Sequence, residues 1–294
     1  MQYKFMRFPG GKSKAITLSY DDGCTADLKL LEIIDKYGLK ATLNLNSALI
    51  PDTKNDDWHI SYAKWQEILK NSPHEIAVHG ALHKAPGLCS PVAVIEDILS
   101  CRKTLEEKLG RIIRGMAYPD SGVTRFAPAS APYEELRGYL KGLGIKYSRS
   151  LGADNDRFDL PADWYNWLPT AHHTNPELFA YLDKFLKLNP NEGYCSAHTP
   201  KLFYLWGHSF EFANNKNWDL LEKFCAEAKS SADEKGDIWF ATNGEIYDYT
   251  KAYESLEWNA EETLAYNPAL TDIYLEYNGE IACIRSGETK NFKK

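Results

Sequence analysis

Short apolar runs alternate with longer amphipathic segments over most of this chain. A short apolar run is typical of a buried strand, and apolar positions that recur every three or four residues are typical of a helix. Strands are expected at Ala15–Tyr20, Ala41–Leu45, Glu75–Val78, Ile112–Ala117, Lys146–Ser148, Leu202–Trp206 and Ile238–Ala241. Helices are expected at Asp27–Tyr37, Tyr62–Lys70, Pro91–Leu109, Tyr133–Leu143, Pro176–Leu188 and Trp218–Asp233.

This alternation predicts an α/β fold with a parallel sheet, and about seven strand–helix units predict a closed or nearly closed barrel. The C-terminal residues differ, because Ile273, Leu275 and Tyr277 alternate with polar neighbours before an Asn-Gly pair that is typical of a two-residue hairpin. We therefore predict a barrel over residues 1–254 and a small β appendage over residues 255–294.

Reactive side chains of such a barrel lie at the C-terminal ends of its strands, on the loops that follow. Several chemically capable residues of this chain fall at these positions. They are Asp21, Asp22, His79, Tyr118, Pro119 and His208.

Two short motifs among them suggest a metal site. The segment S-Y-D-D-G at residues 19–23 ends an apolar run with two carboxylates, and Gly23 permits a turn that lets both converge. The segment H-G-A-L-H at residues 79–83 places His79 and His83 four residues apart, on one face of an expected helical turn. Two imidazoles and a carboxylate leave a coordination position open for water, which is typical of a hydrolytic site.

Composition narrows the classes of function. The chain has 294 residues, a net charge of −7 and no long basic run, so nucleic acid and anionic membranes are poor partners. The first residues lack the apolar segment of a secretory signal, which favours a cytoplasmic protein. The six cysteines form no C-x-x-C pair and are expected to be reduced thiols. Cys24 follows the acidic turn, but no histidine stands beside it to activate a nucleophile.

The two motifs resemble those of the polysaccharide deacetylase family, also called the NodB homology domain or carbohydrate esterase family 4. The resemblance covers roughly residues 15–250 and implies a distorted (β/α) barrel. It implies that Asp22, His79 and His83 bind a divalent cation, zinc in the first place, with cobalt, nickel or manganese as alternatives. It also implies that Asp21 is the general base.

Later family motifs match less well. Where many members carry R-x-P-Y/F-G, this chain has A-Y-P-D-S-G at residues 117–122, so Ala117 replaces the arginine that pairs with the base. Arg114 is too far along the strand to take its place, and pairing of an arginine with Asp21 is not expected. The backbone N–H of Asp120 could still face a developing oxyanion, with a proline-containing loop that has no catalytic part as the alternative.

Two further motifs suggest a general acid and residues that line the substrate pocket. The segment L-W-G-H at residues 205–208 resembles the last family motif, which implies that His208 is the general acid, with a hydrogen-bonded buried histidine as the alternative. Asp163-Trp164 resembles the fourth motif, whose Asp tunes the catalytic His and whose Trp walls the acetyl pocket, with simple core packing of Trp164 as the alternative. The expected substrate-binding residues are Tyr118, Pro119, Asp120, Asp163, Trp164 and Trp206. His172 and His173 are expected to be bystanders on a surface loop.

The sequence therefore predicts a metal-dependent carbohydrate deacetylase acting on an acetylated oligo- or polysaccharide, with N- and O-deacetylation both open. Two alternatives remain. One is an amidohydrolase acting on a small non-sugar amide, and the other is a catalytically silent sugar-binding barrel.

Overall fold

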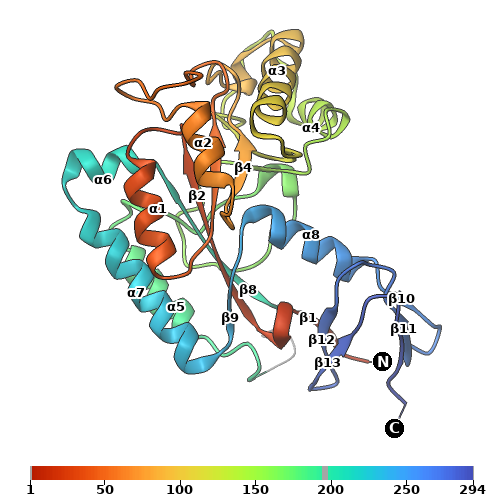
Figure 1. Cartoon of the computed structure of the whole chain (residues 1–294). Coiled ribbons are helices and arrows are strands. Elements are labelled where there is room, and N and C mark those ends of the chain that lie inside the picture. The colour runs from red at the N-terminus through yellow and green to blue at the C-terminus, as the bar shows by residue number, and fades with distance from the viewer. Residues whose placement is uncertain (1, 194–197, 294) are drawn as a thin grey trace.

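A computed structural model describes residues 2–193 and 198–293 of the chain (Figure 1). Most of the expected cysteine thiols fall in this part. Cys24, Cys89, Cys101, Cys225 and Cys283 are free, and Cys195 lies outside the described residues.

The centre of the molecule is a curled parallel sheet. Its strands run in the order β6-β5-β4-β3-β2-β8-β7, and β9 pairs with the N-terminal part of β2. Because this order ends at β6 and β7, the described strands form an open, distorted barrel, which agrees with the expected fold class. The strand bounds are β2 Lys14–Asp21, β3 Ala41–Leu45, β4 Glu75–Val78, β5 Gly115–Ala117, β6 Tyr147–Arg149, β7 Ala171–His172, β8 Lys201–Gly207 and β9 Ile238–Phe240.

Helices connect these strands and cover the sheet (Figure 1). Their bounds are α1 Asp27–Lys36, α2 Tyr62–Leu69, α3 Pro91–Leu109, α4 Tyr133–Gly142, α5 Leu178–Lys187, α6 Ser209–Asn215, α7 Trp218–Lys235 and α8 Asn243–Glu254. Pro91 begins α3 and Gly110, at φ 63°, ends it, as the sequence predicts. The sequence did not predict α6 or α8. None of the helices in the described ranges is long and apolar enough to cross a membrane.

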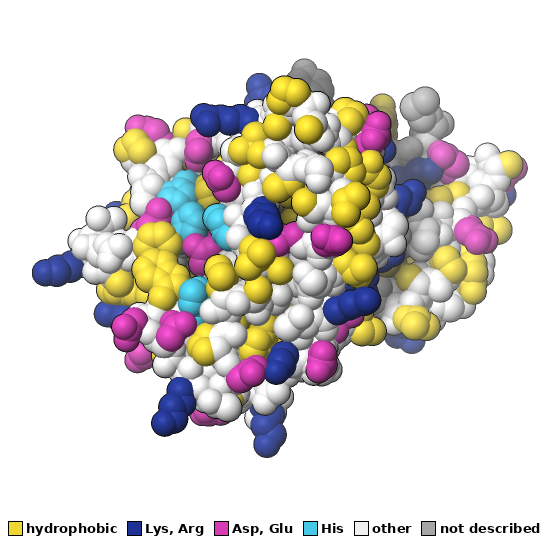
Figure 2. All heavy atoms as spheres, turned by 90° about the horizontal axis from the view of Figure 1, so that it is seen from above, with side chains coloured by type: hydrophobic (Ala, Val, Ile, Leu, Met, Phe, Trp, Pro, Cys, Tyr) yellow, Lys and Arg dark blue, Asp and Glu magenta, His cyan; other side chains and the backbone are white. Residues whose placement is uncertain are grey.

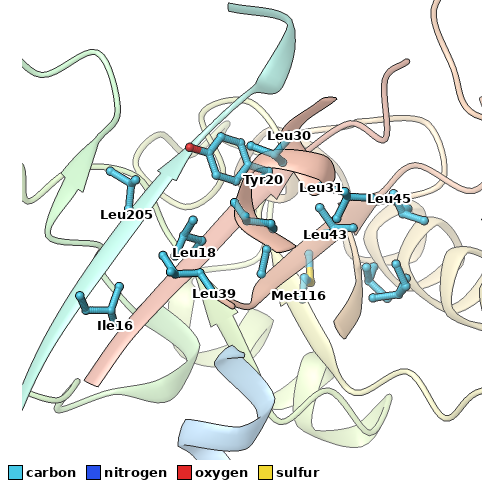
Figure 3. Packing of buried hydrophobic residues seen from close by; sticks show 14 of the residues in the cluster. Ile16, Leu18, Tyr20, Leu30, Leu31, Leu39, Leu43, Leu45, Met116 and Leu205 are labelled. Atoms are coloured by element: carbon cyan, nitrogen blue, oxygen red, sulfur yellow. The ribbon is translucent and has the colours of Figure 1, made fainter. Parts of the chain in front are cut away.

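The main core lies between the sheet and the helices beside it. Figure 3 shows Tyr20 of β2 near Leu30 and Leu31 of α1, and Leu18 of the same strand beside Leu39. All residues of β2 are buried, including the polar ones that alternate with its apolar residues, so both faces of this strand are covered. The first carboxylate of the acidic motif, Asp21, is the last residue of this buried strand.

The C-terminal appendage consists of two small antiparallel sheets (Figure 1). One has the order β1-β12-β13 and the other β10-β11-β14. The predicted hairpin is confirmed, because β12 and β13 are joined by Asn278 and Gly279, both at positive φ. The structure adds β1 to this sheet from the opposite end of the chain. The bounds are β1 Lys4–Arg7, β10 Glu257–Trp258, β11 Leu264–Tyr266, β12 Ile273–Tyr277, β13 Glu280–Ile284 and β14 Thr289–Asn291.

Candidate metal centre and its surroundings

Strand register brings the chemically capable residues to one edge of the sheet. Asp21 pairs in register with Asn44 of β3, and Ala117 of β5 pairs with Arg149 of β6. Val78 ends β4, so His79 follows at the same edge. Figure 2, which views this edge from above, shows histidine side chains gathered with acidic side chains between them.

Asp22, His79 and His83 converge as the sequence predicts. The Oδ1 atom of Asp22 lies 3.6 Å from Nε2 of His79 and 3.6 Å from Nε2 of His83. These three donor atoms lie within 4.8 Å of one another, a spacing that one cation can bridge. Asp22 reaches this position because it leaves β2 in the left-handed conformation, at φ 79°, and Gly23 continues the turn at φ 69°.

The segment that carries the two histidines is not the helical turn that the sequence predicts. It is an irregular loop in which Gly80 has φ 71° and His83 has φ 55°. Asp97 of α3 holds the loop, because its carboxylate accepts hydrogen bonds from the backbone N–H groups of Ala81 (3.1 Å) and Leu82 (3.0 Å). A Cβ at position 80 would lie 2.6 Å from this carboxylate, so the loop requires glycine there.

The donor set fits a divalent cation. Nδ1 of His79 donates to the carbonyl oxygen of Ala117 over 2.9 Å, which fixes the tautomer and leaves the Nε2 lone pair free for a metal. His79 is buried, whereas the side chain of His83 is 36% exposed, so an ion can enter from that side. Burial lowers the pKa of His79, which favours the neutral imidazole that binds a metal.

Asp21 lies beside this triad but is held by other groups. Its Oδ1 accepts a hydrogen bond from Nδ2 of Asn44 over 2.8 Å, and its Oδ2 is bound by the buried guanidinium of Arg149. Burial alone raises the pKa of Asp21, but Arg149, His79 and His208 outweigh burial and lower it. Asp21 is therefore ionised at neutral pH.

Arg149 corrects the sequence analysis, which did not expect an arginine beside Asp21. It comes from the end of β6 rather than from the Ala117 position on β5, and the two positions are register partners. Its guanidinium carbon also lies 4.2 Å from the ring centroid of Trp206, a cation–π contact that orients the group.

A hollow of about 380 Å³ opens next to these groups. Of the residues expected to bind substrate, Tyr118, Asp120 and Trp206 line it. Its full lining is Asp21, His79, His83, Tyr118, Asp120, Ser121, Thr124, Arg125, Leu151, Trp206 and His208. A larger hollow of about 790 Å³ lies in the appendage, but none of its described lining residues is a histidine, so chemistry rather than size identifies the site.

Pro119, Asp163 and Trp164 do not line this hollow. Asp163 accepts hydrogen bonds from the hydroxyl of Tyr133 (2.6 Å) and the backbone N–H of Tyr165 (2.9 Å). Trp164 packs against Trp167. Asp163 therefore does not contact His208 as the family resemblance implies.

His208 lies across from the triad, with Nε2 3.9 Å from Oδ2 of Asp21. Its Nδ1 faces the carboxylate of Glu211 at 3.6 Å. Burial lowers the pKa of His208, but Glu211 and Asp21 outweigh burial and raise it. Glu211 therefore occupies the place that the resemblance gives to Asp163, and the sequence analysis did not identify it.

Cys24 is not in a position to act as a nucleophile. Its Sγ lies 3.0 Å from the hydroxyl of Ser209, and burial raises the pKa of the thiol to about 11. A thiol with this pKa is almost entirely protonated near neutral pH.

A buried carboxyl group below the site gives a first stability prediction. Asp27 begins α1, accepts a 2.5 Å hydrogen bond from Ser209, and has no partner for Oδ2 among the described residues. Burial raises the pKa of Asp27 to about 8, so its contribution to the free energy of unfolding falls as pH rises from the ordinary carboxyl pKa through 8. We expect Asp27→Asn to raise the free energy of unfolding of the metal-free protein by about 1–3 kcal/mol at pH 8.5.

The measurement for Asp27→Asn is urea denaturation of both proteins at pH 5 and pH 8.5. The stability difference between them should be larger at pH 8.5. An equal difference at the two pH values would mean that Asp27 does not titrate in the folded protein.

Comparisons with known proteins identify a family and a shared fold. Residues 9–134 match the family model described as polysaccharide deacetylase. No curated protein matches the chain. The family resemblance inferred from the motifs is thus confirmed.

Two solved structures share the fold at low sequence identity. A protein from Mycobacterium smegmatis assigned to the polysaccharide deacetylases is 18% identical, with a TM-score of 0.56 over 84% of this chain and 93% of that one. Puue allantoinase is 13% identical, with a TM-score of 0.55 over 82% of this chain and 91% of that one. The Streptococcus pyogenes deacetylase PplD, in complex with acetate, is 18% identical, with a TM-score of 0.38 over 45% of this chain. The chain spans 54% of the length of PplD.

Proposed function

Because residues 9–134 belong to the polysaccharide deacetylase family, we propose that this chain is a metal-dependent hydrolase that removes N- or O-linked acetyl groups from a carbohydrate. The observation that carries the proposal is the convergence of Asp22, His79 and His83 beside a second, separately held carboxylate, Asp21.

Asp22, His79 and His83 would hold the cation, which enzymes of this family use. We propose zinc as the native ion, with cobalt, nickel or manganese able to replace it. When bound, such an ion polarises the acyl carbonyl and lowers the pKa of water at the open position.

Asp21 would accept the proton of the attacking water. A general base must be ionised before the reaction, and Arg149 and Asn44 hold Asp21 in that state and in one orientation. The Oδ2 atom of Asp21 also lies 3.8 Å from Nε2 of His79, so the base stands next to the cation site.

His208 would give a proton to the departing amine or alkoxide. Its raised pKa keeps a protonated fraction near neutral pH, and its Nε2 lines the hollow opposite His79. The backbone N–H of Asp120 makes no hydrogen bond within the described part of the chain and is free to face an oxyanion. Tyr118 and Trp206 would wall the acetyl-bearing sugar.

Two functions other than carbohydrate deacetylation need to be tested. The likeness to Puue allantoinase shows a shared fold alone, so a small cyclic amide is a second substrate class to be tested. A silent sugar-binding barrel is the third possibility, and the pairing of Asp21 with Arg149 argues against it, because a site without chemistry does not need an oriented, ionised base.

The experiment is an acetate-release screen with the purified protein loaded with zinc. The panel contains N-acetylated and O-acetylated oligosaccharides, together with cyclic amides and imides. We expect acetate release from at least one acetylated glycan, its loss after chelation and its return when zinc is added back. Turnover of a cyclic amide alone would favour the amidohydrolase, and glycan binding without acetate release would favour the silent barrel.

A further inference from the structure

Four side chains outside the triad form a second cluster around one carboxylate oxygen. The Oε2 atom of Glu211 lies 3.3 Å from Nε2 of His172, 3.0 Å from Nε2 of His173 and 3.6 Å from Nδ1 of His208. The backbone N–H of His208 also donates to this oxygen over 3.3 Å. His173 is buried, and His172, His208 and Glu211 are partly buried, so the cluster lies where the interior meets the surface.

We propose, building on the function proposed above, that Glu211 is a positioning residue that turns Nε2 of His208 toward Asp21 and the hollow, and that His172 and His173 act through Glu211 by holding its carboxylate in place. This inference assigns a role to two histidines that the sequence analysis treated as bystanders.

Strand pairing explains how the cluster forms. His172 of β7 pairs in register with Trp206 of β8, and the backbone N–H of His173 donates to the carbonyl oxygen of Trp206 over 2.9 Å. Both histidines are thereby fixed next to the turn that leads from β8 into α6. They do not lie on a free loop.

Gly207 is required for this packing. A Cβ at position 207 would lie 2.0 Å from Nδ1 of His173, inside any real contact distance. The glycine that separates Trp206 from His208 in the L-W-G-H motif therefore makes room for the His173 ring.

The tautomer of His172 favours a positioning network over a second cation site. Its Nδ1 accepts a hydrogen bond from the backbone N–H of Thr174 over 3.2 Å. Neutral imidazole with an accepting Nδ1 carries its proton on Nε2, which is the atom that faces Glu211. A protonated Nε2 has no lone pair to offer a metal.

The charges around the cluster are consistent with an anionic Glu211. Burial raises the pKa of Glu211, but the contacts with His172, His173 and His208 outweigh burial and lower it. His208 is faced by Glu211 from α6 and by Asp21 from β2, whose own charge is shared with Arg149. The imidazole thus lies between two carboxylates, with one ring nitrogen 3.6 Å from Glu211 and the other 3.9 Å from Asp21.

The test is Glu211→Gln, which keeps the shape of the side chain and removes its charge. Histidine side-chain nitrogen NMR of the zinc-loaded protein measures the tautomer and the pKa of His208 directly. We expect His208 to carry its neutral-form proton on Nδ1 in the original protein and to lose this preference in the variant, with a lower pKa. The kcat for acetate release should fall roughly 10- to 100-fold with KM little changed, and the alkaline limb of the kcat profile should move to lower pH.

Glu222→Gln is the matched control, because Glu222 is a half-exposed carboxylate of α7 that pairs with Lys36 far from the hollow. It should change neither the His208 resonances nor kcat. His172→Gln is a second variant that keeps the proposal testable if Glu211→Gln does not fold, and a smaller change in the same direction is expected.

Two results would overturn the proposal. One is a His208 tautomer and pKa unchanged by Glu211→Gln. The other is a second equivalent of zinc bound by the original protein and lost in His172→Gln, which would make the cluster a cation site. The NMR measurement does not depend on turnover. If the proposed deacetylation is wrong, acetate release will be absent while the tautomer and pKa of His208 still respond to Glu211→Gln.

Discussion

Replacing Asp21 with asparagine is expected to lower kcat for acetate release by roughly 10²- to 10⁴-fold while the protein still binds its cation. Asparagine has nearly the volume of aspartate but cannot accept a proton from water. The two partners of Asp21, Asn44 and Arg149, are both donors, so the new amide group must direct its own N–H bonds at one of them. A modest fall in thermal stability should accompany the loss of activity.

The zinc content of two variants distinguishes the proposed general base from the proposed metal ligands. Zinc measured on the purified Asp21→Asn protein should equal that of the original, whereas Asp22→Ala should lose both zinc and activity, because Asp22 contributes the oxygen nearest both imidazoles. Asp183→Asn, an exposed change on α5, is the matched control. If Asp21→Asn keeps more than a tenth of the original kcat, another group accepts the proton.

The convergence of the triad could be predicted from the sequence because it depends on local features. Asp22 follows a buried strand directly, and His79 follows another, so parallel pairing alone brings them to one edge. The conformation between His79 and His83 could not be predicted, because it depends on Asp97, a residue of α3 that caps the loop from the side. Spacing of four residues suggested a helical turn, and tertiary contacts produced a loop instead.

Arg149 and Glu211 were missed for different reasons. Arg149 is 128 residues from Asp21 along the chain, and only the pairing of β5 with β6 places it where a family arginine was sought on β5. Glu211 lies three residues after His208, close enough to be noticed, but α6 is a short helix without a strong apolar pattern. A search for carboxylates one helical turn after a candidate acid would have found it.

The appendage was also predicted only in part, because one of its strand pairings depends on a local turn and another joins distant parts of the chain. The Asn278-Gly279 turn is a local signal and gave the β12–β13 hairpin. The pairing of β1 with β12 joins the two ends of the chain, and nothing near Lys4–Arg7 in the sequence indicates that partner. Buried Arg7 binds Glu276 within this sheet, which is again a long-range ion pair.

The second large effect is expected from Arg149→Met, which removes the buried cation beside Asp21 and keeps much of the side-chain volume. Breaking a buried ion pair from one side typically costs about 3–5 kcal/mol, because the remaining charge is left without its partner. Arg149 and Asp21 are both almost fully buried, so this range applies at neutral pH. Arg149→Lys, which restores a charge without the planar fork, should recover part of the loss.

The sign of the pH dependence follows from Asp21. In the original protein its pKa is lowered, so its stabilising contribution is present above the ordinary carboxyl pKa and is lost only as pH falls through the lower folded value. Without Arg149, the pKa of Asp21 should rise relative to the original protein, because the largest contact that opposes burial is gone. The stability deficit of the variant should therefore grow as pH rises toward neutrality, and the acid limb of its kcat profile should move to higher pH. Urea denaturation at pH 4.5 and pH 7 should therefore show the larger stability deficit at pH 7.

Arg114→Met is the matched control, since Arg114 pairs with Asp248 at the surface and should change neither the acid limb nor the pH dependence of stability. A deficit that is equal at both pH values would mean that Arg149 supports the fold by packing on Trp206 and not by holding the charge of Asp21.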